Sequence, residues 1–292
     1  MIRFQTTTIP SQVVVLIFML LNSSCSSEEA VTVEERLKVC SFNIRFDNPN
    51  DGFNNWENRR RNVVIFLGVE QPDIIGFQEV LLNQLEYLEL RLPNYQRVGV
   101  GRDDGINQGE FAPIMFLGER FALLDSGNFW LSETPDVPSV GWDALINRIC
   151  TFAVLNDTQG RNKVYFYNTH LSHVGAEARV QSMELIVEHI ASNSSPGDKI
   201  ILTGDLNVEP NSSAYLVAIH SGLSDSFDSN IRLGPIGTYN GFSLTGRNDR
   251  RIDYIFFSGY VSESYVSNSI VIDNQYLSDH FPVIAELISV SQ

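Results

Sequence analysis

Gly204-Asp205-Leu206-Asn207 ends an apolar run, residues 199–206, that we predict to be a β-strand. Four other segments also place a carboxylate, an amide or an imidazole at the end of a predicted strand. They are Phe42-Asn43, Gln78-Glu79, Asn168-Thr169-His170 and Ser278-Asp279-His280. Together the five segments supply the side chains that metal-assisted hydrolysis of a phosphoester requires.

The side chains in these segments match the chemistry of such a reaction. A hard divalent cation such as Mg²⁺ takes oxygen ligands and keeps several waters, so one or two carboxylates and an amide can hold it against phosphate oxygens. Glu79 and Asn43 supply those oxygens. Attack on phosphorus also needs an oriented water, a counter to oxyanion charge and a proton for the leaving oxygen. Those roles can be filled by Asp205, Asn207, His170 and His280.

The chain resembles the endonuclease/exonuclease/phosphatase superfamily from about residue 37 to residue 287. The resemblance is carried by six motifs in the family's order: Ser41-Phe42-Asn43, Gln78-Glu79, Asn168-Thr169-His170, Gly204-Asp205-Leu206-Asn207, Arg251-Ile252-Asp253-Tyr254 and Ser278-Asp279-His280. One short motif is weak, whereas six in order are specific. The resemblance implies a deoxyribonuclease I-like four-layer sandwich of the α/β (α+β) class. In it, two stacked, mostly antiparallel sheets are flanked by helices, and the metal site lies at one edge.

The resemblance also implies roles for individual residues. Glu79 is the principal metal ligand, with Asn43 and Asp279 beside it, and the cofactor is Mg²⁺, with Mn²⁺ as a substitute.

The implied catalytic residues surround this metal site. Asp205 orients or deprotonates the attacking water, and Asn207 positions that water or donates to a phosphoryl oxygen. His280 contacts the scissile phosphate, and Asp253 pairs with it, which fixes one imidazole tautomer and favours the charged form. His170 lies near the leaving group or the phosphate, where some members carry Tyr.

Three further residues are candidates for substrate binding. Glu110 and Arg148 are expected in the cleft, since an Arg can fork onto a phosphate, although either could form an ordinary surface ion pair. Arg59, in the run Arg59-Arg60-Arg61, could steer a phosphate or merely solvate one face of a helix. His173 is a minor candidate because it is close to His170 in the sequence.

The N-terminus has the pattern of an export signal. The apolar run at residues 13–21 is too short to span a bilayer but fits a signal-peptide core, so residues 1–24 are predicted to be removed. We favour a lipoprotein, with Cys25 carrying the lipid and residues 25–36 forming a tether, over an ordinary secretory signal. The protein is then expected in the periplasm or at the cell surface, with residues 37–292 as a single catalytic domain.

The composition bounds the size of the core and the kind of partner. With 292 residues, of which 43% are hydrophobic, the chain can bury one large core. Its net charge of −15 and the absence of a basic stripe in the sequence argue against processive binding of duplex nucleic acid. We therefore expect a small or terminal phosphoester as substrate. We also expect a monomer without an obligate protein partner, which meets the membrane only through its lipid.

Cysteine spacing and apolar periodicity complete the sequence-based picture. Cys40 and Cys150 lie in or beside apolar strands and are expected to be buried free thiols, although export would permit a disulfide between them. Helices are predicted over residues 60–70, 82–92, 177–192 and 213–221.

The first functional hypothesis is a Mg²⁺-dependent phosphodiesterase acting on nucleotides, oligonucleotides or another phosphorylated substrate. The alternatives are a phosphomonoesterase of a sugar or inositol phosphate, and a binding module that has lost its chemistry.

Overall fold

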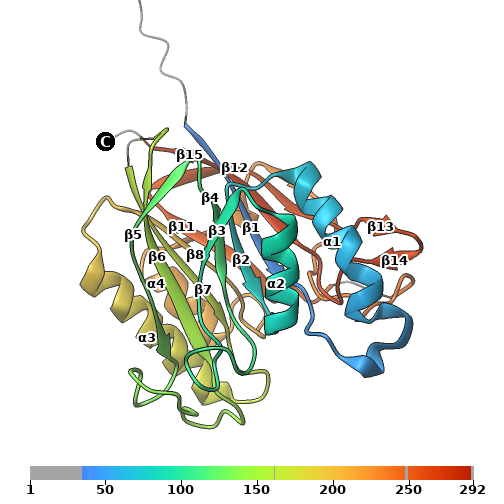
Figure 1. The fold of residues 1–292 in the computed structure, drawn as a ribbon. Helices are drawn as coiled ribbons and strands as arrows, with labels where there is room; N and C mark the ends of the chain where they lie inside the picture. The colour runs from blue at the N-terminus through green and yellow to red at the C-terminus, as the bar shows by residue number, and fades with distance from the viewer. Residues whose placement is uncertain (1–34, 161, 247–248, 291–292) are drawn as a thin grey trace, which may run out of the picture. The chain divides into compact units, whose positions relative to one another are not determined.

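Two large β-sheets pack face to face in the computed structural model, which describes residues 35–160, 162–246 and 249–290 (Figure 1). The strand order is β10-β12-β15-β1-β2-β4-β3 in the first sheet and β5-β6-β7-β8-β11-β9 in the second. The first sheet contains β1 Arg36–Asn43, β2 Ile74–Gln78, β3 Tyr95–Val98, β4 Ile114–Leu117, β10 Ile231–Leu233, β12 Tyr260–Ser267 and β15 Val283–Ser289. The second contains β5 Phe121–Trp130, β6 Ile149–Asp157, β7 Asn162–His170, β8 Lys199–Asp205, β9 Ser224–Asp225 and β11 Asp253–Ser258.

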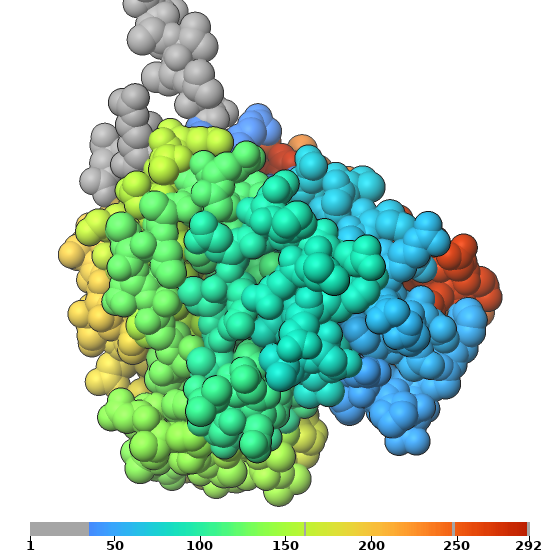
Figure 2. All heavy atoms as spheres, viewed as in Figure 1, coloured from blue at the N-terminus to red at the C-terminus, as the bar shows by residue number. Residues whose placement is uncertain are grey.

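Helices cover the outer face of each sheet, so the predicted four-layer sandwich is confirmed. Helices α1 Trp56–Glu70 and α2 Leu82–Arg91 pack on the first sheet, and α3 Ala176–Asn193 and α4 Ser213–His220 pack on the second (Figure 1). Smaller elements are the 3₁₀ helices η1 Pro49–Asn54 and η2 Ser226–Asp228 and the hairpin strands β13 Val271–Ile272 and β14 Gln275–Tyr276. Both sheets are mixed, because β1 and β2, β7 and β8, and β10 and β12 pair in parallel. In the space-filling view, side chains close the gaps between α1, α2 and β3 (Figure 2).

Apolar side chains at helical spacing explain how these layers join. In α3, Met183, Ile186 and Ile190 recur at intervals of three and four residues and are buried against the second sheet. Between the sheets, Val39, Phe166 and Ile255 belong to a continuous buried core. The sequence pattern therefore forms three apolar layers that hold four layers of secondary structure together.

Helix α1 begins earlier than its pattern predicted. Its first residue is Trp56, not residue 60, because the side chain of Asn55 accepts a hydrogen bond from the Asn58 N–H and caps the helix. The earlier start brings Trp56 and Arg59 into the helix, where they are buried on the same side as Val63 and Phe66.

A buried polar network joins the two sheets beneath the polar edge. Gln78 Nε2 donates to Asn168 Oδ1 at 2.7 Å, and Thr203 Oγ1 donates to the same oxygen at 3.0 Å. Gly76 lies beside them, and a Cβ atom built there would come within 2.1 Å of Thr203 Oγ1. Two residues of the sequence motifs, Gln78 and Asn168, thus hold the sheets together beneath the site.

Strand direction brings the motifs to one edge of the sandwich. In the first sheet, Asn43 at the end of β1 is paired with Gln78 at the end of β2. In the second sheet, Asp205 at the end of β8 is paired with both His170 at the end of β7 and Asp253 at the start of β11.

Some predictions lie outside the described residues. The signal peptide, Cys25 and all but the last two residues of the tether fall in residues 1–34. Among the residues that are described, none of the helices has both the length and the apolar character needed to cross a bilayer. Cys40 and Cys150 are buried free thiols, as expected.

Candidate active site

A cleft of about 550 Å³ opens at the edge where the motif-bearing strands end. Eight of its lining residues were predicted from the sequence as site or substrate residues: Glu79, Glu110, Arg148, His170, Asp205, Asn207, Asp279 and His280. His173, the minor candidate, also lines it. The structure therefore brings together motifs that are widely separated along the chain.

Glu79 follows β2 directly and presents its carboxylate to the cleft. Its φ of 61° is left-handed, an uncommon conformation for a residue other than glycine. Its two carboxylate oxygens accept hydrogen bonds from Asn43 Nδ2 at 3.0 Å and from the Phe46 N–H at 3.2 Å. Glu79 is thus fixed from behind while its carboxylate faces the cleft.

Asn43 points its amide nitrogen, not its amide oxygen, at the carboxylates of Glu79 and Asp205. Its Oδ1 accepts from the Arg45 N–H at 3.0 Å, so its amide nitrogen faces Glu79 and Asp205. It is also fully buried. Asn43 thus lies beside both carboxylates with its amide oxygen bonded to the Arg45 N–H, and its predicted role as a direct metal ligand stays a prediction.

Asp205 lies at the centre of the cluster. It accepts hydrogen bonds from Asn43 Nδ2 at 3.0 Å and from the Asn207 N–H at 2.9 Å. Its Oδ2 lies 3.5 Å from His170 Nε2 and 3.7 Å from His280 Nε2. Burial, together with the nearby carboxylate of Asp253, raises the pKa of Asp205 to about 7. The group is therefore poised to exchange a proton near neutral pH.

Asp253 pairs with His280, as the resemblance implied. Its Oδ2 lies 2.9 Å from His280 Nδ1. Thr238 holds the start of β11 in place, because its Oγ1 accepts from the N–H groups of Ile252 and Asp253. Burial alone would lower the pKa of His280, but the carboxylates of Asp253 and Asp205 raise it well above its ordinary value. The His280 ring is therefore positively charged at neutral pH.

His170 has the opposite charge preference. Burial, reinforced by the nearby Arg148 guanidinium, lowers the pKa of His170 well below its ordinary value. Its Nε2 lies 3.0 Å from Asn207 Nδ2, an amide donor, so the proton belongs on Nδ1, which faces Glu110 Oε2 at 3.9 Å. Asp205 thus lies between one neutral and one charged imidazole.

The wall beside His170 carries the two predicted substrate-binding residues that line the cleft. Arg102 grips Glu110 through two hydrogen bonds of 2.7 and 2.9 Å. Arg148 is 4% exposed, and its Nη2 lies 3.0 Å from His173 Nδ1. Among the described residues Arg148 forms no ion pair within 4.0 Å, so its charge is free to meet an anion.

Arg59 does not belong to this wall, and its predicted contact with substrate is corrected. It is fully buried, and its guanidinium donates to backbone oxygens of Asn54, Ile44 and Leu277. Arg59 lies in α1 four residues before Val63 and seven before Phe66, so it falls on the buried face of that helix.

Three further cleft residues were not predicted as functional. Arg45 clamps Asp51 at 3.0 and 3.1 Å and lies 3.8 Å from Glu79 and 3.9 Å from Asp279. Tyr239 packs edge-on against His280 and, like Arg250, lines the cleft. Arg45 stands two residues after Asn43 and could have been found from that spacing. Tyr239 and Arg250 lie in an irregular segment without apolar periodicity, so nothing in the sequence indicated that they line the cleft.

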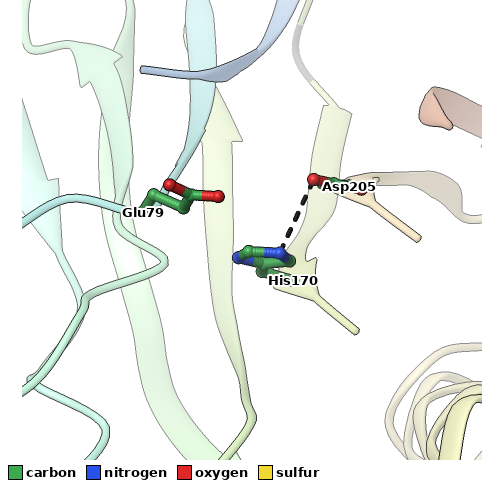
Figure 3. Close-up of side chains that lie close together, drawn as sticks. All are labelled: Glu79, His170 and Asp205. Atoms are coloured by element: carbon green, nitrogen blue, oxygen red, sulfur yellow. Dashed lines mark ion pairs between the residues drawn. The ribbon is translucent and has the colours of Figure 1, made fainter. Parts of the chain in front are cut away.

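The donor set fits a hard divalent cation. Glu79 and Asp205 each offer a carboxylate oxygen, and these oxygens and a ring nitrogen of His170 lie within 4.8 Å of one another. Figure 3 shows the three side chains converging on a common space. Asp279 adds a further carboxylate to the cleft wall, and burial raises its pKa. A bound cation would lower the pKa of such carboxylates and favour their ionised, ligating form.

Comparison with known proteins identifies the family. The sequence profile described as the Endonuclease/Exonuclease/phosphatase family matches residues 40–280. The chain belongs to this family. The match spans all six motifs, so the predicted superfamily is confirmed.

Solved structures and curated proteins agree with this assignment. A family protein from Bacteroides vulgatus is 37% identical, with a TM-score of 0.84, over 88% of this chain and 100% of that chain. A mannosyl-6-phosphatase from Bacteroides thetaiotaomicron is 36% identical, with a TM-score of 0.81, over 86% and 99%. Tyrosyl-DNA phosphodiesterase 2 of Danio rerio is 22% identical over 67% of this chain and 47% of its own length. The prediction of an enzyme that hydrolyses phosphoester bonds is confirmed at the level of the family.

Proposed function

We propose that the chain is a Mg²⁺-dependent phosphomonoesterase that acts on a small phosphorylated molecule, with a sugar phosphate as the preferred class. The observation that carries the proposal is the cleft wall. There the buried guanidinium of Arg148, which forms no ion pair with the described residues, adjoins the Glu110 carboxylate held by Arg102, and a neutral imidazole lies near that carboxylate. Such groups can bind a phosphate and the hydroxyls of a compact polar substrate. The 36% identity to a mannosyl-6-phosphatase supports this class.

The residues at the centre divide the work of hydrolysis. Glu79, with Asp279 and Asp205 beside it, would hold a divalent cation, which would supply Lewis-acid polarisation of the phosphate. Asp205 accepts the proton of the attacking water, because its carboxylate is central to the cleft and its pKa is near neutrality. His280, held charged by Asp253, stabilises the negative charge that develops on the phosphoryl oxygens.

The neighbouring side chains orient the reacting groups. Asn207 has a left-handed φ of 53°, which places its amide in the cleft beside His170. Its Nδ2 also donates to Leu171 O at 3.1 Å, so the amide gives up one of these two contacts when it donates to the water or to a phosphoryl oxygen. His170 carries its proton on Nδ1, which is buried without a hydrogen-bond partner among the described residues and lies 3.9 Å from Glu110 Oε2, so it can donate from that atom toward the leaving-group side of the cleft.

A phosphodiester is the second candidate substrate. The match to tyrosyl-DNA phosphodiesterase 2 favours it. Against it stands the net charge of −15, which disfavours the many phosphate contacts that bind a long nucleic acid. A short or terminal diester would avoid that cost.

A paired assay separates the two substrates. Hydrolysis of p-nitrophenyl phosphate and of bis-p-nitrophenyl phosphate is measured with Mg²⁺, with Mn²⁺ and with EDTA, followed by phosphate release from mannose 6-phosphate and inositol phosphates. The proposal predicts metal-dependent turnover with a higher kcat/KM for the monoester. A higher kcat/KM for the diester would overturn it in favour of a phosphodiesterase. If neither compound and no sugar phosphate is turned over in a metal-dependent reaction, the result would favour a binding module.

We also propose that the enzyme is an exported lipoprotein. The proposal is supported by the apolar run at residues 13–21 and by Cys25 shortly after it. Labelling of the expressed full chain with a radioactive fatty acid, compared with the Cys25→Ala variant, tests it. Equal labelling of both chains, or labelling of neither, would contradict it.

A further inference from the structure

Arg59 makes an unusual set of contacts for a buried cation. Its Nη1 donates to two backbone oxygens, that of Ile44 at 2.8 Å and that of Leu277 at 2.7 Å. Its Nε donates to Asn54 O at 2.6 Å and its Nη2 to Arg45 O at 3.3 Å. Within the described residues it forms no ion pair inside 4.0 Å, so backbone carbonyls alone satisfy its guanidinium. The planar fork of an Arg is what allows one side chain to reach four carbonyls.

The backbone segments that Arg59 joins both carry side chains of the cleft. Ile44 and Arg45 directly follow Asn43, whose amide holds Glu79 and Asp205. Leu277 precedes Asp279 by two residues. The two segments are otherwise far apart in the sequence, and a single nitrogen of Arg59 bridges them. Any shift of this guanidinium would therefore move both sides of the metal cradle relative to each other.

The surroundings of the Arg59 side chain fix it in place. Its guanidinium lies 5.6 Å from the centre of the Trp56 ring and 5.4 Å from that of Phe242. The residue is fully buried. A side chain confined in this way holds the backbone segments that it bonds in fixed positions, and it cannot move when a substrate binds.

The charge of Arg59 and its hydrogen bonds would change metal affinity in opposite directions. A positive charge behind Glu79 and Asp279 repels an incoming cation, so its removal by itself would tighten metal binding. Loss of the bridge between the two segments would loosen the cradle and weaken binding. The direction in which metal affinity changes when Arg59 is substituted therefore distinguishes a positioning role from a purely electrostatic one.

We propose that Arg59 is a positioning residue for the metal cradle, holding the segment after Asn43 and the segment before Asp279 at the separation that a divalent cation requires. This inference rests on the proposed metal-dependent function and deepens it. Arg59 itself touches neither the cleft nor the substrate. Partners that orient metal ligands typically change metal affinity or activity by about 10- to 100-fold when they are altered.

Mn²⁺ binding to the full-length chain tests this role, measured by calorimetry below the unfolding temperature of each variant. Arg59→Lys keeps the charge and loses the fork, whereas Arg59→Gln loses both. Arg120→Lys is the matched control, because Arg120 is also buried but bonds to Asp157 and Asp73 away from the cleft. We expect both Arg59 variants to raise the Mn²⁺ Kd at least about tenfold, and the control to leave it unchanged. The kcat of the Arg59 variants should recover at saturating Mn²⁺.

Each other outcome overturns the role. A wild-type Kd in Arg59→Lys with tighter binding in Arg59→Gln would show that charge alone matters. Unchanged affinity in both variants with a lowered Tm would make Arg59 a purely structural residue, as would failure of both variants to fold. No Mn²⁺ binding by the wild-type chain would instead overturn the proposed function, and the role of Arg59 with it.

Discussion

Asp205 links the geometry of the cleft to its chemistry. It is buried, it lies between two imidazoles of opposite charge preference, and its pKa of about 7 allows it to take up a proton near neutral pH. We predict that Asp205→Asn lowers kcat at least about a hundredfold, the scale for removal of a general base. Near wild-type turnover of Asp205→Asn would remove Asp205 from the mechanism.

The same carboxyl predicts a pH dependence. Because the base must be ionised, kcat/KM should rise with pH and level off at or below about pH 7, since a bound cation lowers the pKa of Asp205. A pH profile of the wild-type enzyme at saturating metal measures this limb. Activity that falls as the pH rises from 5 to 7 would contradict the assignment of Asp205 as the base.

Single residues show what sequence could and could not predict. The pairing of Asp253 with His280 and the convergence of Glu79 and Asp205 were predicted, because strand ends and motif order carry that information. Arg59 was misread because the helix was predicted to begin at residue 60, whereas Arg59 lies inside α1 on the buried face that it shares with Val63 and Phe66. The orientation of the Asn43 side chain depends on a hydrogen bond from the Arg45 N–H. The sequence of side chains does not show where such a backbone donor points, so this orientation could not be predicted.

At the scale of elements, the close approach of β2 to β7 and β8 supports the cleft from beneath. Gly76 leaves no room for a side chain, because a Cβ there would meet Thr203 Oγ1 and Asn168 Oδ1. We predict that Gly76→Ala destabilises the fold by about 1–3 kcal/mol through overpacking. Gly68→Ala, in α1 with nothing within 4 Å of the added Cβ, should stabilise it by about 0.5–1 kcal/mol. Urea unfolding measures the free energy of unfolding of both variants and of wild type. Equal values for Gly76→Ala and Gly68→Ala would show that the sheets move apart easily to admit the added methyl group.

The beginning of β1 carries a separate pH sensitivity. Burial, together with the neighbouring Asp157, raises the pKa of Glu35 from 4.5 to about 7. The folded state therefore binds this proton more tightly than the unfolded state, and stability falls as the pH rises between these two values. We predict that Glu35→Gln, which resembles the protonated form, has a higher Tm than wild type above pH 7 and an equal Tm below pH 4.5. Glu184→Gln, exposed on α3, should show no such difference.

Element boundaries were predicted less well than element types. All four α-helices were predicted, yet α1 begins at Trp56 instead of residue 60. Apolar periodicity marks where a helix is buried, whereas its first residue is set by a cap.

At the scale of the whole molecule, the candidate metal site spans the two sheets. Glu79 follows a strand of the first sheet, whereas Asp205 ends a strand of the second. A ligand that binds only the folded state raises its stability in proportion to the logarithm of its concentration. We predict that Mn²⁺ raises the Tm of the wild-type chain progressively and that EDTA reverses the rise. The Glu79→Gln variant should lose most of this shift, and an equal shift in both would place the cation elsewhere.

The central claim is that this cleft hydrolyses phosphoesters with a metal ion held by Glu79. The most direct test is the rate of p-nitrophenyl phosphate hydrolysis by wild type, Glu79→Gln and the exposed control Glu86→Gln, each with Mg²⁺ and with EDTA. We predict Mg²⁺-dependent turnover in wild type and Glu86→Gln, and its loss in Glu79→Gln. Turnover that persists in EDTA or in Glu79→Gln would contradict the claim.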